Sequence, residues 1–391
     1  MRFGNVEKSY VARFLRSLSF FGAVTVPYML DWLQVDYTRI FLLQAWFCLW
    51  IVIFEVPTGV FADKVGRKVS LMLGTMLFIV DLVIFGTTRD YMILYVAEFF
   101  GALGIALYSG VDKSLIYDSL LEEGRAGEGR KCFSNYEAAG TLAVVISFPL
   151  GSYLAGSGLI AYPMSLAFMF LLSALTIALS MGLILSMKEP ERRKPVESGL
   201  KMSIIGLTAI MKDSRLRRFA LNSVLISSLT FFMFWFYQPL TEMAGYDVRW
   251  FGIVGASYNL VAAGLLLNVH RIEKLFGMKR LLECTAVLPG LFFLGLAFTG
   301  NGAFIIASIF VIAVSKILRA PILADYMNQH IESDLRATVL SSVSLMERLI
   351  IFILYPIVGM LADANLRIAF VMLGLLILIS AALARIDHMY L

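Results

Sequence analysis

Charged side chains that could exchange ion-pair partners cluster in a short break between two long apolar runs. The break, residues 59–68, reads Gly-Val-Phe-Ala-Asp-Lys-Val-Gly-Arg-Lys. Asp63 can pair with Arg67 and can also cap a helix N-terminus, where backbone N–H groups lack partners. Contacts that form in one conformation and break in another bias a two-state equilibrium. The spacing therefore predicts a conformational switch, with simple anchoring of cations at the membrane surface as the alternative.

Two glycines belong to the same break. Gly59 would let a neighbouring helix approach closely, because small residues permit tight packing in membranes. Gly66 would allow a turn that a side chain would strain. The predicted gating residues are Gly59, Asp63, Lys64, Gly66, Arg67 and Lys68.

Ionisable side chains also occur inside the apolar runs. A charge near the bilayer centre costs about 2.5–3.5 kcal/mol, so it usually faces a cavity or a partner. Glu98 could carry a proton, because burial favours the neutral form of a carboxyl group. Lys316 could pair with Glu98 or hold an anionic group of a substrate, and a static structural pair is the alternative. Glu55, Asp31 and Asp81 are further candidates for proton or ion coupling, the last two near helix ends that water can reach.

A second possible ion pair joins the two halves of the chain. Glu55 lies two helical turns before Asp63, and we expect it to pair with Arg348. In the alternative interpretation each residue pairs within its own half, for instance Arg348 with the neighbours of Glu347.

Aromatic side chains suggest the kind of substrate. The run at 231–239 contains Trp235, Tyr237 and Gln238, and Tyr108 lies in an earlier span. Aromatic and Met surfaces suit apolar or amphipathic ligands. These four residues are therefore our candidates for the substrate cavity together with Lys316, although packing against lipid would explain many aromatics equally well.

The elements that must position these residues are membrane helices. Of the 391 residues, 59% are hydrophobic and only 16% are charged, against about 45–50% and about 25% in soluble domains. Apolar runs of about 20 residues predict about twelve spans, and the alternation of a β-barrel is absent. The expected spans are residues 10–33, 39–62, 70–88, 91–116, 133–157, 163–187, 217–242, 249–271, 280–299, 303–326, 337–362 and 367–386.

The basic residues predict the orientation. The net charge is +5, but the cations collect in alternate loops, which favours membrane topology over nucleic-acid binding. The four cations of the opposite loops are Arg39, Arg89, Arg249 and Arg367. We expect a multi-pass protein of the cell (inner or plasma) membrane with both termini in the cytoplasm and with membrane lipids around it.

The chain divides at a charged linker. We expect an N-terminal bundle over 1–187, a cytoplasmic linker over 188–216 and a C-terminal bundle over 217–391. Alternating apolar and polar residues from Leu200 to Met211 predict an amphipathic helix on the membrane surface, with a loosely ordered linker as the alternative.

The two halves also form a weak repeat, as in many transporters. Lys113 parallels Lys316, and Glu137 parallels Glu347. A degenerate copy of the charged break occurs at 273–280. The common order of these matches predicts a duplicated bundle.

Residues 59–68 resemble the signature of the major facilitator superfamily, Gly-x-x-x-Asp-(Arg/Lys)-x-Gly-Arg-(Arg/Lys), at every defined position and in the loop between the second and third spans. The topological resemblance covers essentially the whole chain. It implies an all-α membrane protein of two pseudo-symmetric six-helix bundles, with a central cavity that opens alternately to either side. It also implies that Asp63 reaches a helix start near Arg336 in the other bundle. Residues 147–152 approximate the helix-five signature of the family's drug/proton antiporter branch, and Glu98 stands about where that branch often has an arginine.

Patterns for catalysis are absent, including phosphate-binding loops, nucleophile elbows and metal-spaced His/Cys sets. We therefore expect no enzyme activity, no cofactor and no metal. The expected function is secondary active transport by a monomer that exports small amphipathic molecules, coupled to protons. The alternatives are uptake or facilitated passage of an organic anion through Lys316, and a lipid- or lysolipid-handling protein on the same scaffold. Substrate, direction and coupling ion stay open.

Overall fold

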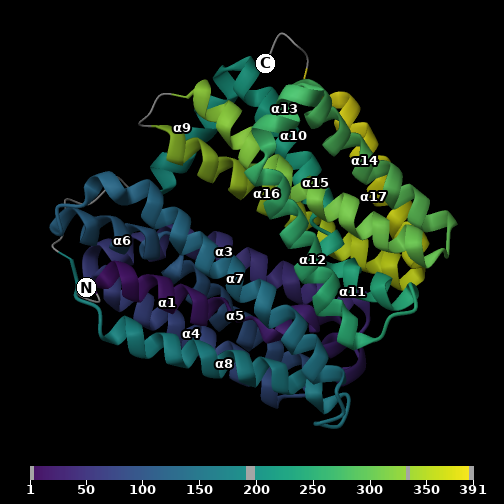
Figure 1. Cartoon of the computed structure of the whole chain (residues 1–391), viewed down its shortest axis with the longest axis horizontal. Helices are drawn as coiled ribbons and strands as arrows, with labels where there is room; N and C mark the ends of the chain where they lie inside the picture. Colours follow the sequence, from purple (N-terminus) through teal and green to yellow (C-terminus); the bar gives the residue numbers. More distant parts are fainter. Residues whose placement is uncertain (1–3, 191–198, 332–334, 387–391) are drawn as a thin grey trace. The chain divides into compact units, whose positions relative to one another are not determined.

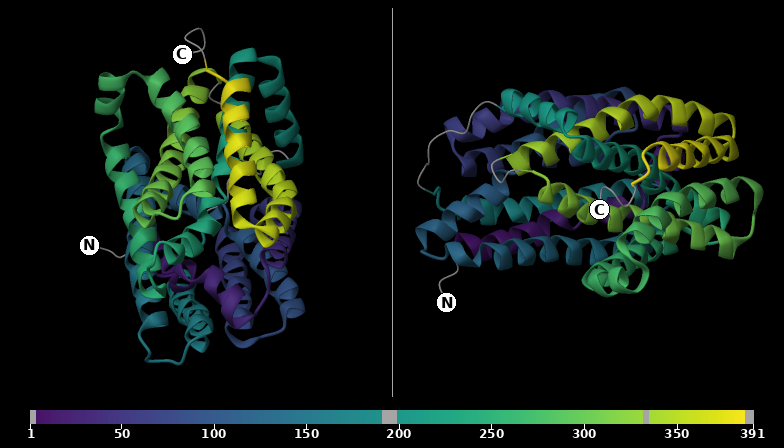
Figure 2. Two further views of the ribbon diagram at one scale, coloured as in Figure 1. Left: turned by 90° about the vertical axis from the view of Figure 1, so that its right-hand side faces the viewer. Right: turned by 90° about the horizontal axis from the view of Figure 1, so that it is seen from above.

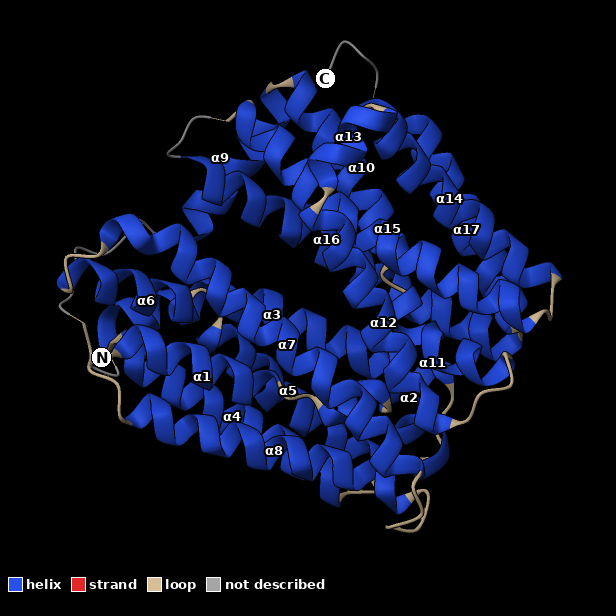
Figure 3. Ribbon diagram, viewed as in Figure 1, coloured by secondary structure: helices blue, strands red, loops and turns tan. Residues whose placement is uncertain are grey.

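Long helices make up the chain, as the apolar runs predict. The computed structural model describes residues 4–190, 199–331 and 335–386, so residues 191–198 of the expected linker lie outside it. Within these ranges the elements are helices and no strand occurs (Figure 3). Eleven helices are long and apolar enough to cross a membrane, and a broken helical segment precedes them. The predicted all-α membrane fold is confirmed.

The helices gather into two compact units. Unit 1 holds the described residues within 1–35, 46–199 and 248–253, and unit 2 holds those within 36–45, 200–247 and 254–391. Figure 2 shows that long helices make up both units. The elements of unit 1 are α1 (Asn5–Ser17), η1 (Phe20–Ala23), α2 (Thr25–Pro27), η2 (Tyr28–Trp32), most of α3 (Tyr37–Val65), α4 (Arg67–Thr87), α5 (Tyr91–Tyr108), α6 (Val111–Glu122), η3 (Ala126–Glu128), α7 (Gly129–Gly156) and α8 (Met164–Leu185). The elements of unit 2 are α9 (Gly199–Lys212), α10 (Ser214–Thr230), α11 (Met233–Met243), most of α12 (Val248–Leu267), α13 (Val269–Phe276), α14 (Met278–Phe298), α15 (Gly302–Gln329), α16 (Arg336–Ala364) and α17 (Leu366–Leu383).

Small residues bring the helices of unit 1 close together. In Figure 1, α4 lies beside α5 and α8. A Cβ added at Gly74 of α4 would stand 2.7 Å from the Gly104 carbonyl oxygen of α5, and one added at Gly104 would stand 2.7 Å from the Gly74 carbonyl oxygen. Van der Waals packing at such close contacts holds helices together, because the hydrophobic effect does not drive helix association in lipid.

The first expected span, residues 10–33, is not one helix. Backbone N–H groups freed by the break after α1 still need acceptors, because an unpaired group is costly in a membrane. Ser19 N–H donates to Ser147 Oγ of α7 at 3.1 Å, and Phe20 N–H donates to Ser173 Oγ of α8 at 3.0 Å. These hydroxyls from neighbouring helices make the break tolerable.

Two further spans are also interrupted. The span expected over 91–116 consists of α5 and α6, separated at Gly110, whose φ of +76° favours glycine. The span expected over 217–242 consists of α10 and α11, separated at Phe231 and Phe232. Unwound backbone inside spans occurs in transporters, where it lines cavities and ion sites.

Helix α9 packs within unit 2. A Cβ added at Gly206 would stand 2.7 Å from the Thr338 carbonyl oxygen of α16, so the two helices nearly touch there. A buried apolar cluster that includes Ile210, Phe219 and Leu282 joins α9, α10 and α14. The core of unit 2 thus extends to the helix that follows the linker.

Candidate functional site

The predicted switch loop turns sharply between α3 and α4. Helix α3 ends at Val65, and α4 begins at Arg67. Gly66 between them has a φ of +127°, a conformation that a side chain would strain. Gly59 has open space where its Cβ would be, and Asp63 and Lys64 are exposed. The loop therefore presents the Asp63 carboxylate on the surface of unit 1.

The carboxylate partners of this loop come from elsewhere in unit 1. Glu189 accepts hydrogen bonds from the backbone N–H groups of Arg67 at 2.7 Å and Lys68 at 2.8 Å, and so caps α4. The Arg67 guanidinium forms an ion pair with Asp118 of α6 and donates to the Ser114 carbonyl oxygen at 2.6 Å. Asp118, rather than the expected Asp63, is the partner of Arg67. In the sequence, the place of Glu189 in a charged run after α8 could have identified it as a candidate partner.

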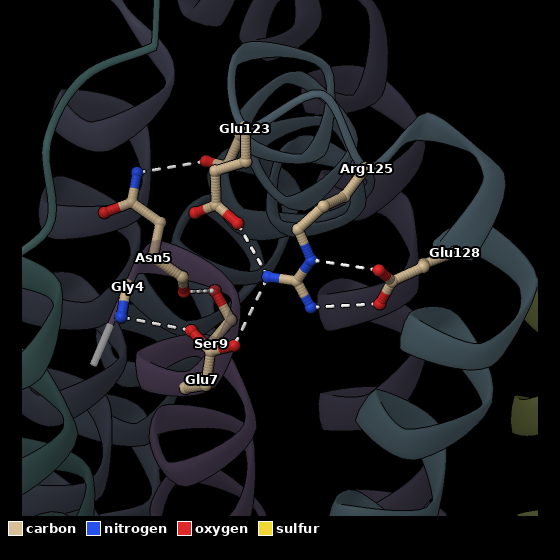
Figure 4. A network of polar contacts seen from close by, with 8 residues as sticks. Gly4, Asn5, Glu7, Ser9, Glu123, Arg125 and Glu128 are labelled. Atoms are coloured by element: carbon tan, nitrogen blue, oxygen red, sulfur yellow. Dashed lines mark hydrogen bonds and ion pairs between the residues drawn. The ribbon is translucent and has the colours of Figure 1, made fainter. Parts of the chain in front are cut away.

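A second ion cluster gathers around Arg125, between α6 and η3 (Figure 4). Arg125 bonds Glu123 at 2.7 Å and Glu128 at 3.1 Å, and it reaches Glu7 of α1 at 3.5 Å. The carboxylates of Glu128 and Glu123 raise the pKa of the Arg125 guanidinium. The Gly4 N–H donates to the Glu7 carboxylate at 3.0 Å. This cluster ties the start of α1 to the α6–α7 connection.

A lysine–glutamate pair lies between α6 and α7 of unit 1. Lys113 Nζ lies 2.7 Å from Glu137 Oε1, and Arg13 of α1 lies 3.1 Å from the other carboxylate oxygen. Tyr136 O–H donates to the neighbouring Asp112 carboxylate. One carboxylate thus holds cations from two helices of the bundle.

The repeat-related residues of unit 2 form a similar group. Lys316 of α15 and Glu347 of α16 interact electrostatically, and Arg348 also acts on Glu347. Lys316 Nζ also lies 5.3 Å from the ring centre of Phe231, which attracts a cation. Lys113 and Glu137 thus form an ion pair, and Lys316 and Glu347, which the sequence repeat predicts to correspond to them, interact electrostatically.

Arg16 and Tyr108 form a cation–π contact in unit 1, with the Arg16 guanidinium 3.7 Å from the ring centre. The Nε and Nη2 atoms of Arg16 are buried and have no hydrogen-bond partner among the described residues. An arginine always keeps its charge and has five donors to satisfy. Sequence reasoning selected Tyr108 but missed Arg16, whose signal was a second cation near the start of the first span.

Asp81 of α4 and Glu98 of α5 form a buried pair of acids. Their residues are 5% and 6% exposed, and Glu98 acts electrostatically on Asp81. Asp81 Oδ1 has no hydrogen-bond partner among the described residues. A Cβ added at Gly101 would stand 2.8 Å from Asp81 Cγ, so α5 fits closely over this carboxyl group. Two of the proton-site candidates thus lie together.

The other charged candidates are separate from this pair. Asp31 of η2 is exposed and accepts a hydrogen bond from Tyr162 O–H. Glu55 is an exposed residue of α3 in unit 1, whereas Arg348 belongs to unit 2. The Glu55–Arg348 and Glu98–Lys316 links stay predictions, since each joins residues of different units.

The aromatic candidates of α11 are packed inside unit 2. Trp235 is 5% exposed, and Tyr237 and Gln238 are 0% and 1% exposed. Gln238 Nε2 donates to the Tyr237 hydroxyl oxygen at 3.2 Å, and the ring centres of Tyr237 and Tyr258 are 5.8 Å apart. A substrate would reach these side chains only after the surrounding rings move.

Arg319 of α15 is a charged residue that sequence reasoning missed. It is fully buried. Its guanidinium donates to the Leu282 carbonyl oxygen at 2.6 Å, to Thr285 Oγ1 at 3.0 Å and to the Asn222 amide oxygen. The guanidinium therefore joins α15 to α10 and α14.

A comparison with known protein families identifies the family of this chain. The family description "Major Facilitator Superfamily" matches residues 10–355. The chain belongs to the Major Facilitator Superfamily. This membership confirms the family inferred from residues 59–68, and it makes the chain a multi-pass membrane transporter rather than an enzyme.

Several solved structures share the fold of this superfamily member. A mutant of the nucleoside transporter NupG has a TM-score of 0.82 at 14% identity, with 97% of this chain and 99% of that chain covered. A bacterial homolog of the human lysosomal transporter Spinster has a TM-score of 0.77 at 15% identity, covering 97% and 95%. A D-xylose–proton symporter has a TM-score of 0.74 at 14% identity, with the same coverage. At these identities the likeness shows the fold alone. No curated protein matches the chain significantly by sequence.

Proposed function

We propose that this transporter couples the export of small amphipathic molecules to the movement of protons. The observation that carries the proposal is the buried Asp81–Glu98 pair. Two carboxylates that interact inside a bundle repel each other, and one bound proton removes this repulsion. The unbonded Asp81 Oδ1 favours a protonated pair further, because an unpaired buried charge is costly.

Protonation of this pair can change helix packing. Gly101 of α5 lies against the Asp81 carboxyl group of α4. A second charge on the pair would push α4 and α5 apart at this close contact. The proton would then bias the conformational equilibrium through its different affinity for the two states.

The proposal also includes antiport and an orientation of the protein in the membrane. The antiporter-like residues 147–152 lie in α7, where Ser147 accepts a hydrogen bond from the broken first segment. Asp63 and its neighbours act as the switch, and the protein works as a monomer. We place both termini in the cytoplasm and the protein in the cell membrane, because Lys and Arg concentrate in the corresponding loops.

Proteoliposomes that contain a pH-sensitive dye would test this function. Candidate amphipathic cations, organic anions and lysolipids are first screened by thermal shift, because ligand binding raises apparent stability. Addition of a binding compound should then change the internal pH. Glu98→Gln should keep compound binding and lose the pH dependence of transport, whereas Glu128→Gln, at an exposed ion pair, should resemble wild type. An unchanged pH dependence in Glu98→Gln would reject Glu98 as the proton carrier.

Passage of an organic anion is the second candidate function. It is favoured by the buried, unsatisfied donors of Arg16 and by Lys316 in the other unit. Arg16→Gln should then raise the KM for an anionic substrate while leaving amphipathic cations unaffected. Flux of the anion without any change of internal pH would favour this function over proton antiport.

A further inference from the structure

Two pockets of unit 2 join at one end of α14 and α17, which lie side by side (Figure 1). The first has a volume of about 520 Å³ and surrounds Gly277 at the start of α14. The second has a volume of about 300 Å³ and continues along α14 and α17. Glu283 and Arg385 line both pockets. The two pockets therefore form one groove, called the α14–α17 groove below.

The mouth of the groove is basic. Among the described residues that line the first pocket, Lys279, Arg280 and Arg385 are cations and Glu283 is the one carboxylate. Arg385 Nη2 lies 3.2 Å from Glu283 Oε1. Arg385 and Glu283 neutralise each other, so Lys279 and Arg280 give the mouth a net positive charge. This charge favours an anionic ligand.

A buried cation lies directly behind the groove wall. Asn222 and Leu282 line the second pocket. Both accept hydrogen bonds from the Arg319 guanidinium, which is fully buried. The described partners of this guanidinium are neutral oxygens, so its charge is not cancelled there. In a medium of low dielectric constant, this charge adds to the positive potential of the groove.

The start of α14 corresponds to the start of α4 in unit 1. At α4, the Glu189 carboxylate binds the backbone N–H groups of Arg67 and Lys68. At α14, Gly277 has a φ of +77° and lines the first pocket together with the first residues of the helix. An anionic oxygen in the first pocket would accept hydrogen bonds from the backbone N–H groups at the start of α14, as Glu189 does at the start of α4.

The inner part of the groove is apolar. It is lined by Ala286 and Val287 of α14 and by Leu378 and Ala382 of α17. These residues belong to segments that can span the membrane. Next to the mouth, Leu275 and Phe276 of α13 are 77% and 60% exposed, as in a helix that lies at a membrane interface. An occupant must therefore have an anionic head and an apolar tail.

We propose that the α14–α17 groove binds an anionic phospholipid of the membrane leaflet next to it. The phosphate contacts Lys279, Arg280 and Arg385, and one acyl chain lies along Val287 and Ala382. Basic pockets between membrane helices on the cytoplasmic side recognise anionic head groups in this way. The site does not depend on the transported substrate or on proton coupling.

Lipid binding can be measured on the full chain purified in detergent. The probes are dioleoyl-phosphatidylglycerol, dioleoyl-phosphatidylcholine and inorganic phosphate, and the readouts are the thermal unfolding midpoint and lipid adducts in native mass spectrometry. Phosphatidylglycerol should raise the midpoint of wild type more than phosphatidylcholine does. The double variant Lys279→Gln/Arg280→Gln should bind phosphatidylglycerol about 10- to 30-fold more weakly.

Two matched controls make the result specific. Arg130→Gln/Lys131→Gln removes two exposed cations from the start of α7, and it should leave phosphatidylglycerol binding unchanged. Ala382→Trp should block the acyl chain without changing the charge, whereas Leu383→Trp, at a neighbouring exposed position, should leave lipid binding intact. Equal losses in the two double variants would overturn the proposal, as would binding of phosphate that is as strong as that of the lipid. Binding of phosphatidylglycerol that Ala382→Trp leaves intact would also overturn it.

Discussion

The Lys113 ammonium of α6 lies 2.7 Å from the Glu137 carboxylate of α7. The two side chains are 53% and 47% exposed, so the pair contributes at most about 1 kcal/mol to stability. The corresponding Lys316 and Glu347 interact electrostatically in unit 2. Because an exposed pair adds so little to stability, the arrangement of Lys113 and Glu137 in unit 1 favours a role in transport.

The first prediction concerns this pair. Lys113→Met and Glu137→Gln should each reduce transport strongly while the thermal midpoint stays close to wild type. The double variant should be no worse than either single variant, because the two residues act as one unit. Flux into proteoliposomes would show this, with protein content matched. Two independent, multiplying losses would contradict the interpretation.

The second prediction concerns the ion pair between Arg67 and Asp118. Their side chains are 25% and 11% exposed, so Asp118→Asn would leave a largely buried cation without its carboxylate. We expect a loss of about 1–3 kcal/mol in the free energy of unfolding. Denaturation in detergent would measure it. The more exposed Arg125–Glu128 pair is the comparison, and Glu128→Gln should have a clearly smaller effect, because water screens exposed ion pairs. Equal effects of the two substitutions would refute a structural role of Asp118.

The third prediction tests whether Asp63 serves the conformational switch rather than folding. This carboxylate is exposed, whereas Arg67 and Lys68 are held by Glu189. Asp63→Ala should therefore insert and fold normally but transport slowly. Membrane abundance and flux would be measured together, with Glu189→Gln as the comparison that destabilises the start of α4. Wild-type flux in Asp63→Ala would remove Asp63 from the switch.

The fourth prediction tests the contact between α4 and α5. Gly74→Ala would place a methyl group 2.7 Å from the Gly104 carbonyl oxygen, and backbone cannot rotate away. Overpacking of this kind costs about 1–3 kcal/mol. Gly182→Ala in α8 is the matched control, because no atom lies within 4 Å of its added Cβ. The thermal midpoint should fall for Gly74→Ala alone, and a parallel fall in the control would point to a general effect of alanine.

The sequence by itself determined the membrane helices and the superfamily. Apolar runs of about 20 residues form helices in lipid, because each helix satisfies its own backbone hydrogen bonds. The signature at 59–68 and the parallel positions of Lys113 and Lys316 are local patterns. Such patterns can be read without knowing which helices touch.

Only the tertiary structure decided which side chains meet. Asp118 and Glu189 hold the loop because α6 and the end of α8 pack beside the start of α4, and their distance along the chain hides this relation. The break after α1 depends on Ser147 and Ser173, whose hydroxyls look like ordinary helix residues in the sequence. The pairing of Asp81 with Glu98 likewise follows from the close packing of α4 on α5. Partners far apart along the chain become neighbours only when helices pack, and that packing depends on many small contacts at once.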